Sequence, residues 1–174
     1  MDGQRTESFV TMGAPEMKPI LRPAGPDDEE FVFQLYASTR EGEFSSLGWS
    51  RTQLEPLLRM QFAAQRQWYQ TAYPGYEHHI VMAEGTPIGR MMIKRAPEAV
   101  LLVDIALMPE HRGKGTGEAL LLDLLQQSSA QGLPVRLQVL KNNPAARLYE
   151  RVGFVRTGED QMYWQMERPP TPVS

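Results

Sequence analysis

Three glycines within five residues separate an apolar run from a leucine-rich segment, and this junction constrains the fold more than any other part of the sequence. The apolar run is Ala99 to Met108, and the turn is Arg112-Gly-Lys-Gly-Thr-Gly117. The leucine-rich segment is predicted to be a helix from about Thr116 to Ser129. Glycines at such a junction let the backbone turn tightly and present several N–H groups toward one point. A strand, a glycine turn and a helix are therefore expected in direct succession.

Apolar periodicity predicts the remaining helices and strands. Before the glycine turn we expect a strand at 19–22, a helix from Pro26, a helix from the cap residue Ser50 to about Tyr73, and strands at 77–84, 88–94 and 99–108. After the leucine-rich helix we expect a strand at 135–140, a helix at 144–152 and strands at 153–156 and 161–166. This order of elements is typical of a mixed α/β sheet.

The chain is predicted to form one folded domain with polar ends. Its 174 residues suit a single domain of ordinary size. Residues 1–17 are polar and rich in Gly, Pro and Ser, so we interpret them as a flexible N-terminal arm. The prolines of residues 169–174 indicate a flexible C-terminal tail, because successive prolines cannot continue a ladder. The folded domain is expected at 18–168.

The overall composition argues against several classes of protein. Lys and Arg number 18 against 21 Asp and Glu, and this net charge of −3 disfavours broad binding to nucleic acid. Without cysteine, the chain has no disulfide, thiolate zinc site or cysteine nucleophile. Residues 1–18 lack the apolar run of a secretory signal, and no stretch approaches the ~20 apolar residues of a membrane span. We expect a cytoplasmic protein without membrane contact.

The glycine turn is predicted to bind a phosphate or pyrophosphate, because the helix that follows adds the positive end of its dipole. Arg112 can add a guanidinium to the same oxygens. Two common nucleotide motifs do not fit. A Walker loop requires Ser or Thr after Gly-Lys, where this chain has Gly115, and a dinucleotide fingerprint starting at Gly113 would end on Glu118 instead of glycine. A tight turn that binds nothing is the alternative.

Two motifs of this chain are similar to those of one enzyme family. Arg112-x-x-Gly115-x-Gly117 resembles the Gln/Arg-x-x-Gly-x-Gly/Ala motif of the GNAT superfamily of acyl-CoA-dependent N-acetyltransferases. About thirty residues further, Asn142 to Phe154 resembles the family's Asn-x-x-Ala-x-x-x-Tyr-Glu-x-x-Gly-Phe segment. The order of the predicted elements also agrees with that family from Pro19 to about Glu167, so the resemblance covers most of the chain.

The resemblance implies a mixed, mostly antiparallel seven-stranded sheet flanked by about four helices. It further implies acetyl-CoA as the acyl donor, with no metal. In the family, backbone N–H groups of the glycine turn hold the pyrophosphate of the coenzyme, and the strand before the turn pairs with the pantetheine arm. The cofactor-binding residues implied here are Ile105, Ala106, Leu107, Met108, Arg112, Gly113, Lys114, Gly115, Thr116, Gly117 and Asn142.

Three positions carry individual roles that the resemblance implies. A backbone N–H near Leu107 would polarise the thioester carbonyl, as an oxyanion hole does. Asn142 would hydrogen-bond the pantetheine region. Tyr149 would lie near the sulfur as a hydrogen-bond donor or general acid, although full proton transfer from a phenol to a thiolate is uphill by roughly 2 kcal/mol in water. A core tyrosine is the alternative for Tyr149.

Asp104 is a lone carboxylate inside the apolar stretch 100–107 and is the candidate general base. An amine acceptor with a pKa of ~10.4 is protonated at pH 7, so a base or a chain of waters has to remove its proton. Burial would raise the pKa of Asp104 toward a useful range. A structural carboxylate, bonded to backbone where the strand bulges, remains the alternative.

Two adjacent histidines, His78 and His79, lie in a predicted strand. Their side chains should face opposite sides of the sheet, so at most one of them faces a site, which argues against a paired metal site. We interpret each as a half-buried structural histidine.

The resemblance therefore implies that the chain is an N-acetyltransferase. It would transfer an acetyl group from acetyl-CoA to a primary amine, on a small molecule or a protein, by direct attack in a ternary complex. The lack of cysteine agrees with a reaction that has no acyl-cysteine. The alternative is an acyl-CoA-binding regulatory module without turnover. The resemblance also allows a homodimer, formed through edge strands or the C-terminal hairpin.

Overall fold

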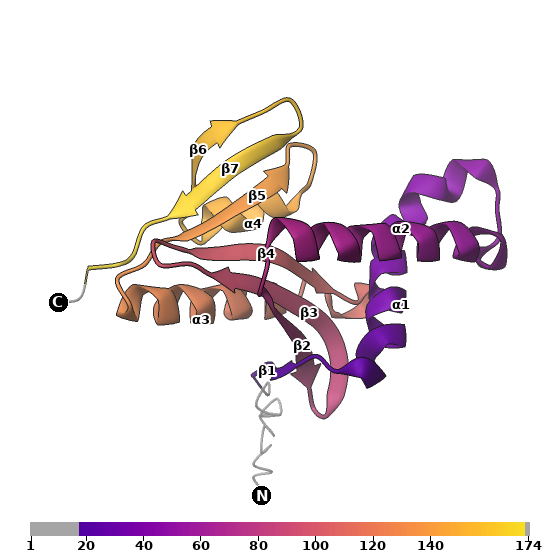
Figure 1. The fold of residues 1–174 in the computed structure, drawn as a ribbon, viewed down its shortest axis with the longest axis horizontal. Helices are drawn as coiled ribbons and strands as arrows, with labels where there is room; N and C mark the ends of the chain where they lie inside the picture. The colour runs from indigo at the N-terminus through magenta and orange to yellow at the C-terminus, as the bar shows by residue number, and fades with distance from the viewer. Residues whose placement is uncertain (1–17, 173–174) are drawn as a thin grey trace, which may run out of the picture.

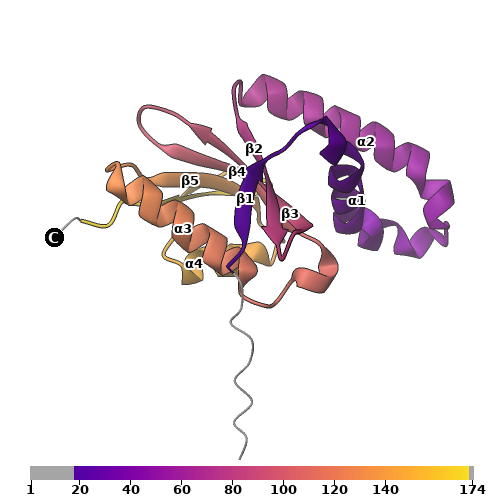
Figure 2. The ribbon, with the colours of Figure 1, turned by 90° about the horizontal axis from the view of Figure 1, so that it is seen from below.

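The structure, a computed structural model, describes residues 18–172 as one sheet between two layers of helices (Figures 1 and 2). Helices α1 (Glu29–Arg40) and α2 (Arg51–Ala72) lie on one face of the sheet. Helices α3 (Thr116–Ala130) and α4 (Ala145–Arg151) lie on the other face. The arm predicted at residues 1–17 lies outside the described residues.

The sheet contains seven strands in the order β1-β2-β3-β4-β5-β7-β6. They are β1 (Ile20–Pro23), β2 (Glu77–Ala83), β3 (Thr86–Arg95), β4 (Val100–Leu107), β5 (Val135–Leu140), β6 (Val155–Glu159) and β7 (Tyr163–Arg168). All neighbouring strands are antiparallel except β4 and β5, which are parallel. The prediction of a mixed, mostly antiparallel sheet flanked by four helices is confirmed.

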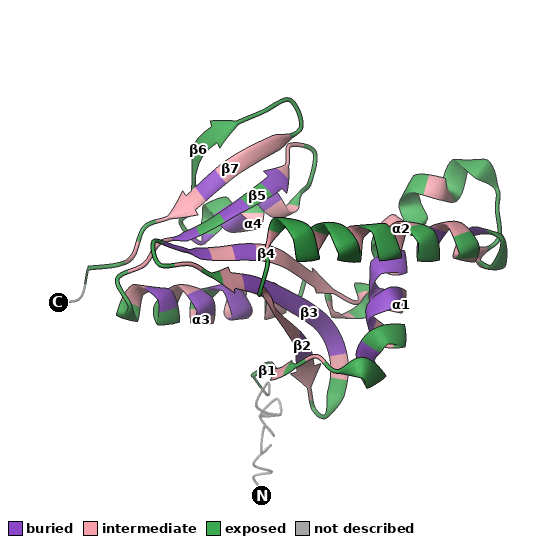
Figure 3. Ribbon diagram, in the orientation of Figure 1, coloured by how far each residue is buried: buried purple, intermediate pink, exposed green. Residues whose placement is uncertain are grey.

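The buried residues form two cores, one between the sheet and helices α3 and α4 and one between helices α1 and α2 (Figure 3). The larger core joins strands β2 to β5 and β7 to α3 and α4, and it contains Met91, Leu121 and Tyr149. The smaller core joins α1 to α2 through Phe33 and Leu58, both 0% exposed. The face of the sheet that α3 and α4 cover is therefore packed with apolar residues. The contact between the sheet and α2 includes polar residues, such as Arg90 and Gln65.

Helix α2 begins where the sequence predicted a cap. The backbone N–H of Gln53 donates to Ser50 Oγ at 3.2 Å, and the backbone N–H of Ser50 donates to Gln53 Oε1 at 2.8 Å. This reciprocal capping box satisfies two donors that the first turn of a helix leaves free. Within residues 18–172, no helix combines the length and the apolar content needed to cross a membrane.

Two parts of the fold differ from the prediction. A 3₁₀ helix, η2 (Glu41–Leu47), occupies the segment between α1 and α2, for which the sequence analysis gave no element. Strands β6 and β7 each begin two residues later than predicted, at Val155 and Tyr163. Every residue of β6 is exposed, so no apolar alternation marks its ends.

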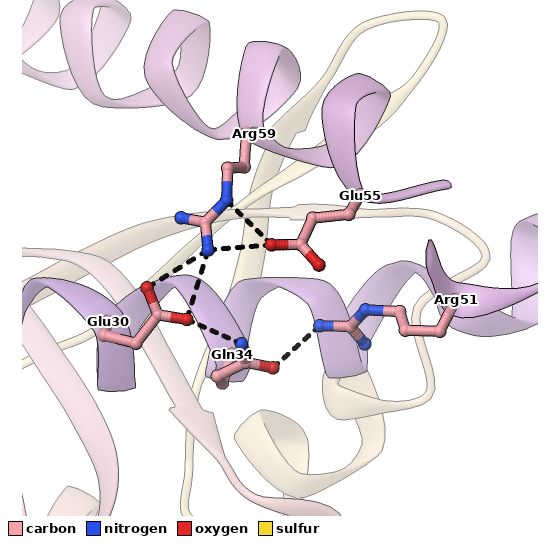
Figure 4. Close-up of polar contacts among 5 residues, drawn as sticks. All are labelled: Glu30, Gln34, Arg51, Glu55 and Arg59. Carbon is pink, nitrogen blue, oxygen red and sulfur yellow. Dashed lines mark hydrogen bonds and ion pairs between the residues drawn. The ribbon is translucent and has the colours of Figure 1, made fainter. Parts of the chain in front are cut away.

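Charged side chains connect α1 to the first half of α2 (Figure 4). Arg59 donates to Glu55 at 2.9 Å on its own helix and to Glu30 at 3.1 Å on α1. Its guanidinium also lies 3.9 Å from the ring centroid of Phe33. Arg51 donates to Gln34 on α1 at 2.8 Å. Exposed ion pairs contribute at most about 1 kcal/mol each, so the packing around Phe33 holds α1 and α2 together more than these charges do.

The corner between β1 and α1 depends on one buried carboxylate. Asp28 accepts two hydrogen bonds from the guanidinium of Arg22, at 2.7 and 2.8 Å, and one from the backbone N–H of Gly25 at 2.8 Å. The hydrogen bonds from Arg22, followed by that from Gly25, lower the pKa of Asp28 to about 2. The carboxylate is therefore held in its charged form at neutral pH.

Replacing Asp28 by asparagine is expected to remove part of the acid sensitivity of the fold. The pKa of about 2 in the folded protein lies below the ~3.9 of an unfolded aspartate. Asp28 therefore stabilises the fold fully above about pH 4 and loses this contribution as the pH falls toward 2. Urea unfolding should show a large difference between wild type and Asp28→Asn at pH 6 and a small one near pH 2.5. Asp27→Asn, at the exposed neighbour, is the control; an equal effect there would contradict the assignment.

Candidate functional site

The two central parallel strands separate partway along their length. Strands β4 and β5 pair only through Val100 with Val135, Leu101 with Arg136 and Leu102 with Leu137. The rest of β4, residues 103–107, pairs with β3 alone among the described residues. Half of β4 therefore presents unpaired backbone groups to the gap between β4 and β5, in the middle of the sheet.

A β-bulge at Val103 decides which face of the sheet Asp104 occupies. In the register between β3 and β4, Ile93 pairs with Leu102 and Met92 pairs with Asp104, so Val103 is the extra residue. Leu102 lies in the core below α3, and strict alternation would place Asp104 in that core as well. The bulge instead turns Asp104 to the face that α2 covers.

The carbonyl of Leu107 faces the gap between β4 and β5. The guanidinium Nε of Arg112 donates to Leu107 O at 2.9 Å, whereas the next backbone N–H, that of Met108, donates to Ile88 O on β3 at 2.8 Å. In an antiparallel ladder the N–H and C=O of one residue point to the same side. The N–H of Leu107 therefore also faces the gap, as its predicted role requires.

A second feature of this strand end is the close approach of β3. A Cβ on Gly89 would lie 2.3 Å from the carbonyl oxygen of Ala106, so only glycine fits opposite Leu107. The backbone of β4 at this point is thus held tightly by its neighbour.

The glycine turn is exposed and leaves its backbone donors free. Gly113 and Gly115 have φ values of +70° and +82°, a left-handed conformation that glycine adopts without strain. The backbone N–H groups of residues 113–118 have no acceptor within residues 18–172. Since these donors lie at the N-terminus of α3, a helix of 15 residues, the turn suits a pyrophosphate.

Asp104 is paired with a buried arginine that the sequence analysis did not identify. Arg90 of β3 donates from Nε to Asp104 Oδ2 at 2.8 Å, and its Nη2 lies 2.8 Å from the same oxygen. Arg90 also donates to Gln65 Oε1 of α2 at 3.2 Å. The side chain of Arg90 is 6% exposed and that of Asp104 26%. The signal was present in the sequence, because Arg90 is the one charged residue in the apolar stretch 88–93.

The second oxygen of Asp104 remains available. Oδ1 accepts no hydrogen bond from a side chain of the described residues, whereas Oδ2 is held by Arg90. The two oxygens are therefore unequal: Oδ2 is fixed by a guanidinium, and Oδ1 is open to a further hydrogen bond. Tyr69 of α2 lies near this carboxylate, and burial, followed by the charge of Asp104, raises the pKa of Tyr69.

Tyr149 lies in the larger core, 8% exposed, with its ring edge-on to Phe154 at 5.7 Å between centroids. Burial, followed by the nearby charge of Asp104, raises the pKa of Tyr149. The phenol therefore stays protonated at any physiological pH. The ring of Tyr149 thus packs in the core, and Asp104 on β4 is close enough to influence the pKa of its hydroxyl.

Asn142 lies in the exposed connection between β5 and α4. The next residue, Asn143, accepts a hydrogen bond from the backbone N–H of Ala145 at 2.9 Å and so starts α4. Asn142 is thus at the end of β5 where the gap opens, on the opposite side of it from Leu107.

Removing Arg90 is expected to destabilise the fold by leaving the charge of Asp104 without its partner. For Arg90→Met we expect a loss of about 2 kcal/mol in unfolding free energy, less than for a fully buried pair because Asp104 is partly exposed. The double variant Arg90→Met with Asp104→Leu should recover most of this loss. Breaking the more exposed pair of Arg136 and Glu167 by Arg136→Met should cost less than about 1 kcal/mol. Urea unfolding of the four proteins measures all three values, and a double variant no more stable than Arg90→Met would contradict the coupling.

The described residues thus form an open mixed sheet whose central parallel strands diverge beside a glycine turn and a helix N-terminus. A sequence profile of the acetyltransferase (GNAT) family matches residues 34–154, and the chain belongs to this family. The predicted family is thereby confirmed.

Individual relatives agree with this assignment. The PaiA N-acetyltransferase from Thermoplasma acidophilum, solved with coenzyme A, has a TM-score of 0.66 and 20% identity, over 88% of this chain and 99% of that one. A chimeric spermidine N-acetyltransferase, in part from Vibrio cholerae, has a TM-score of 0.60 and 22% identity, over 88% and 96% of the two chains. A mycothiol acetyltransferase from Stackebrandtia nassauensis is 33% identical over 99 residues, which are 56% of this chain. The match spans about a third of that relative's length, 31%.

Proposed function

We propose that this protein transfers an acetyl group from acetyl-CoA to a primary amine, with both substrates bound at once. The observation that carries the proposal is the exposed glycine turn, whose free N–H groups precede α3 directly beside the unpaired half of β4. Family membership supports the use of acetyl-CoA. Amine acceptors are supported by the names of the PaiA and spermidine N-acetyltransferases, to which the fold is similar.

The coenzyme is proposed to lie along the gap between β4 and β5. N–H groups of residues 113–117 and the guanidinium of Arg112 would hold the pyrophosphate. The Nε of Arg112 donates to Leu107 O in this structure. On coenzyme binding this hydrogen bond would either persist or be replaced by one to the pyrophosphate. The backbone of residues 105–108 would pair with the pantetheine arm, and Asn142 would bond it from the opposite side of the gap. These contacts would all come from the proposed single domain, 18–168.

Acetyl-CoA supplies an acetyl group activated as a thioester. The N–H of Leu107 is proposed to donate a hydrogen bond to the thioester carbonyl, which polarises it. Tyr149 is proposed to donate a hydrogen bond to the sulfur. Its raised pKa makes Tyr149 a poor proton donor, so it would stabilise the departing thiolate without giving up its proton.

Asp104 is proposed to act on the acceptor side through its free oxygen, Oδ1. Arg90 fixes the orientation of the carboxylate through its contacts with Oδ2. A charged carboxylate on the α2 face would attract an ammonium group and take up a proton directly or through water. With no cysteine in the chain, an acyl-cysteine is excluded.

The proposal is tested first by thermal unfolding with acetyl-CoA, coenzyme A, ATP and NAD in parallel. A ligand at a hundred times its dissociation constant adds about 2.7 kcal/mol, enough to raise the melting temperature by a few degrees. We expect a shift with the two coenzymes alone. A panel of amines with detection of released thiol follows, and intersecting initial-rate lines would support the ternary complex. A larger shift with ATP or NAD would contradict the proposal, and coenzyme binding without thiol release from any amine would favour a regulatory module.

A further inference from the structure

A cavity of about 360 Å³ lies between α2, the start of α1 and strands β2 and β3. His78, Arg90 and Met92 line its sheet side, and Phe62, Gln65 and Tyr69 of α2 line the other. Cavities of this size take small organic ligands, and this one lies on the same face of the sheet as Asp104.

The ionised groups around this cavity neutralise one another. Among the lining residues, Arg90 is paired with Asp104, Asp28 with Arg22, and Arg66 with Glu29. Burial, followed by the charge of Arg90, lowers the pKa of His78 to about 4, so the imidazole is uncharged at neutral pH. A buried charge without a partner is costly, so the deep part of the cavity favours an uncharged group.

One polar atom in this cavity lacks a partner. Nε2 of His78 is buried and has no hydrogen bond within residues 18–172. Buried polar atoms in folded proteins nearly always have a partner, and a ligand is one way to supply it. A neutral imidazole nitrogen donates or accepts according to its tautomer, so a hydroxyl or a ring N–H of a ligand satisfies it.

The remaining lining is mostly aromatic and apolar. The rings of Phe62, Tyr69 and Tyr76 surround the cavity together with Met92 and Val32. Aromatic side chains favour stacked or edge-on contact with another ring. A flat ring with one hydrogen-bonding substituent therefore matches both the walls and His78.

The cavity is also close to the proposed reacting centre. Met92 pairs with His78 on one side and with Asp104 on the other, so the three residues form one row across β2, β3 and β4. Adjacent strands lie ~4.8 Å apart, which puts His78 about 10 Å from Asp104. A ring bonded to His78 and carrying an amine on a chain of two or three carbons spans this distance.

We infer that this cavity binds the remote end of the acceptor, an uncharged aromatic ring with a hydroxyl or N–H group that bonds to His78. The inference rests on the proposed function. His78 would then determine specificity, whereas the sequence analysis interpreted it as structural.

Calorimetric titration of the full chain, with and without coenzyme A, tests the inference without turnover. The probes are tyramine, phenethylamine (which lacks the hydroxyl) and the aliphatic diamine cadaverine. We expect tyramine to bind at least tenfold more tightly than phenethylamine, and cadaverine to bind most weakly. This comparison on wild type needs no variant to fold.

The matched variants are His78→Leu and His79→Leu, because the two side chains lie on opposite faces of β2. His78→Leu should weaken tyramine at least tenfold and leave phenethylamine within threefold, whereas His79→Leu should change neither. Tighter binding of cadaverine, or equal effects of the two variants, would overturn the inference. If cadaverine is acetylated in preference to tyramine, the proposed function holds and the inference fails; if no coenzyme binds, the proposed function itself fails.

Discussion

Replacing Gly117 by aspartate is expected to lower the affinity for acetyl-CoA by about a hundredfold while leaving the fold intact. Gly117 has ordinary helical geometry, and an added Cβ would meet only Leu148 Cδ2 at 3.6 Å, a normal contact. Two like charges about 4 Å apart near a protein surface repel by about 4 kcal/mol, and salt screening leaves roughly 2 to 3 kcal/mol of this. That loss corresponds to about a hundredfold in affinity.

The matched control is Gly117→Asn, which has the same size and no charge. Asparagine should lower the affinity by tenfold or less. The negative charge of an aspartate in the first turn of α3 also interacts favourably with the positive end of the helix dipole. The melting temperature of the Gly117→Asp variant should therefore equal that of wild type or be slightly higher. Calorimetric titration with coenzyme A and a thermal scan together measure both effects. Equal losses for Asp and Asn would mean that the pyrophosphate does not lie at this turn.

Removal of the Tyr149 hydroxyl is expected to lower kcat by about a hundredfold with little effect on coenzyme binding. Phenylalanine keeps the ring contact with Phe154, and no hydrogen bond of the hydroxyl within residues 18–172 is lost. The variant should therefore fold as wild type does. A positioned hydrogen bond to a reacting atom contributes about a hundredfold or more to rate, which is the expected loss.

The pH profile separates the two roles considered for Tyr149. Because burial raises its pKa, the wild-type rate should show no fall from Tyr149 ionisation as the pH rises through 10, the usual value for tyrosine. Steady-state kinetics of wild type and Tyr149→Phe between pH 7 and 10 measure both points. A kcat within threefold of wild type would assign Tyr149 to the core alone.

Local patterns in the sequence were sufficient to predict most of the fold. The cap at Ser50, the strand at Val135–Leu140 and the leucine-rich helix were all predictable, because caps and apolar periodicity act over a few residues. The boundaries of β6 were less predictable, since its exposed residues follow no apolar pattern.

The surroundings of the candidate site were harder to predict, because they depend on contacts between distant segments. Asp104 stood out as a lone carboxylate, but its pairing with Arg90 depends on the register of β3 and β4. A bulge in this strand was part of only one of the two interpretations of Asp104, and the register of β3 and β4 places it at Val103. His78 was expected to be structural. It lines a cavity because α2 packs over its face of the sheet, and Tyr69 of α2, nine residues earlier in the sequence, lines the opposite wall.

The divergence of β4 from β5 gives this protein an edge strand in the middle of its sheet. An edge strand with free backbone groups is a template on which another extended chain can pair, and many proteins cover such edges to avoid aggregation. Among the described residues, Arg112 caps one carbonyl of the edge formed by residues 103–107, that of Leu107, and no strand pairs with this edge. A coenzyme bound along this edge would shield it, so acetyl-CoA would protect the folded protein from self-association as well as serve as its substrate.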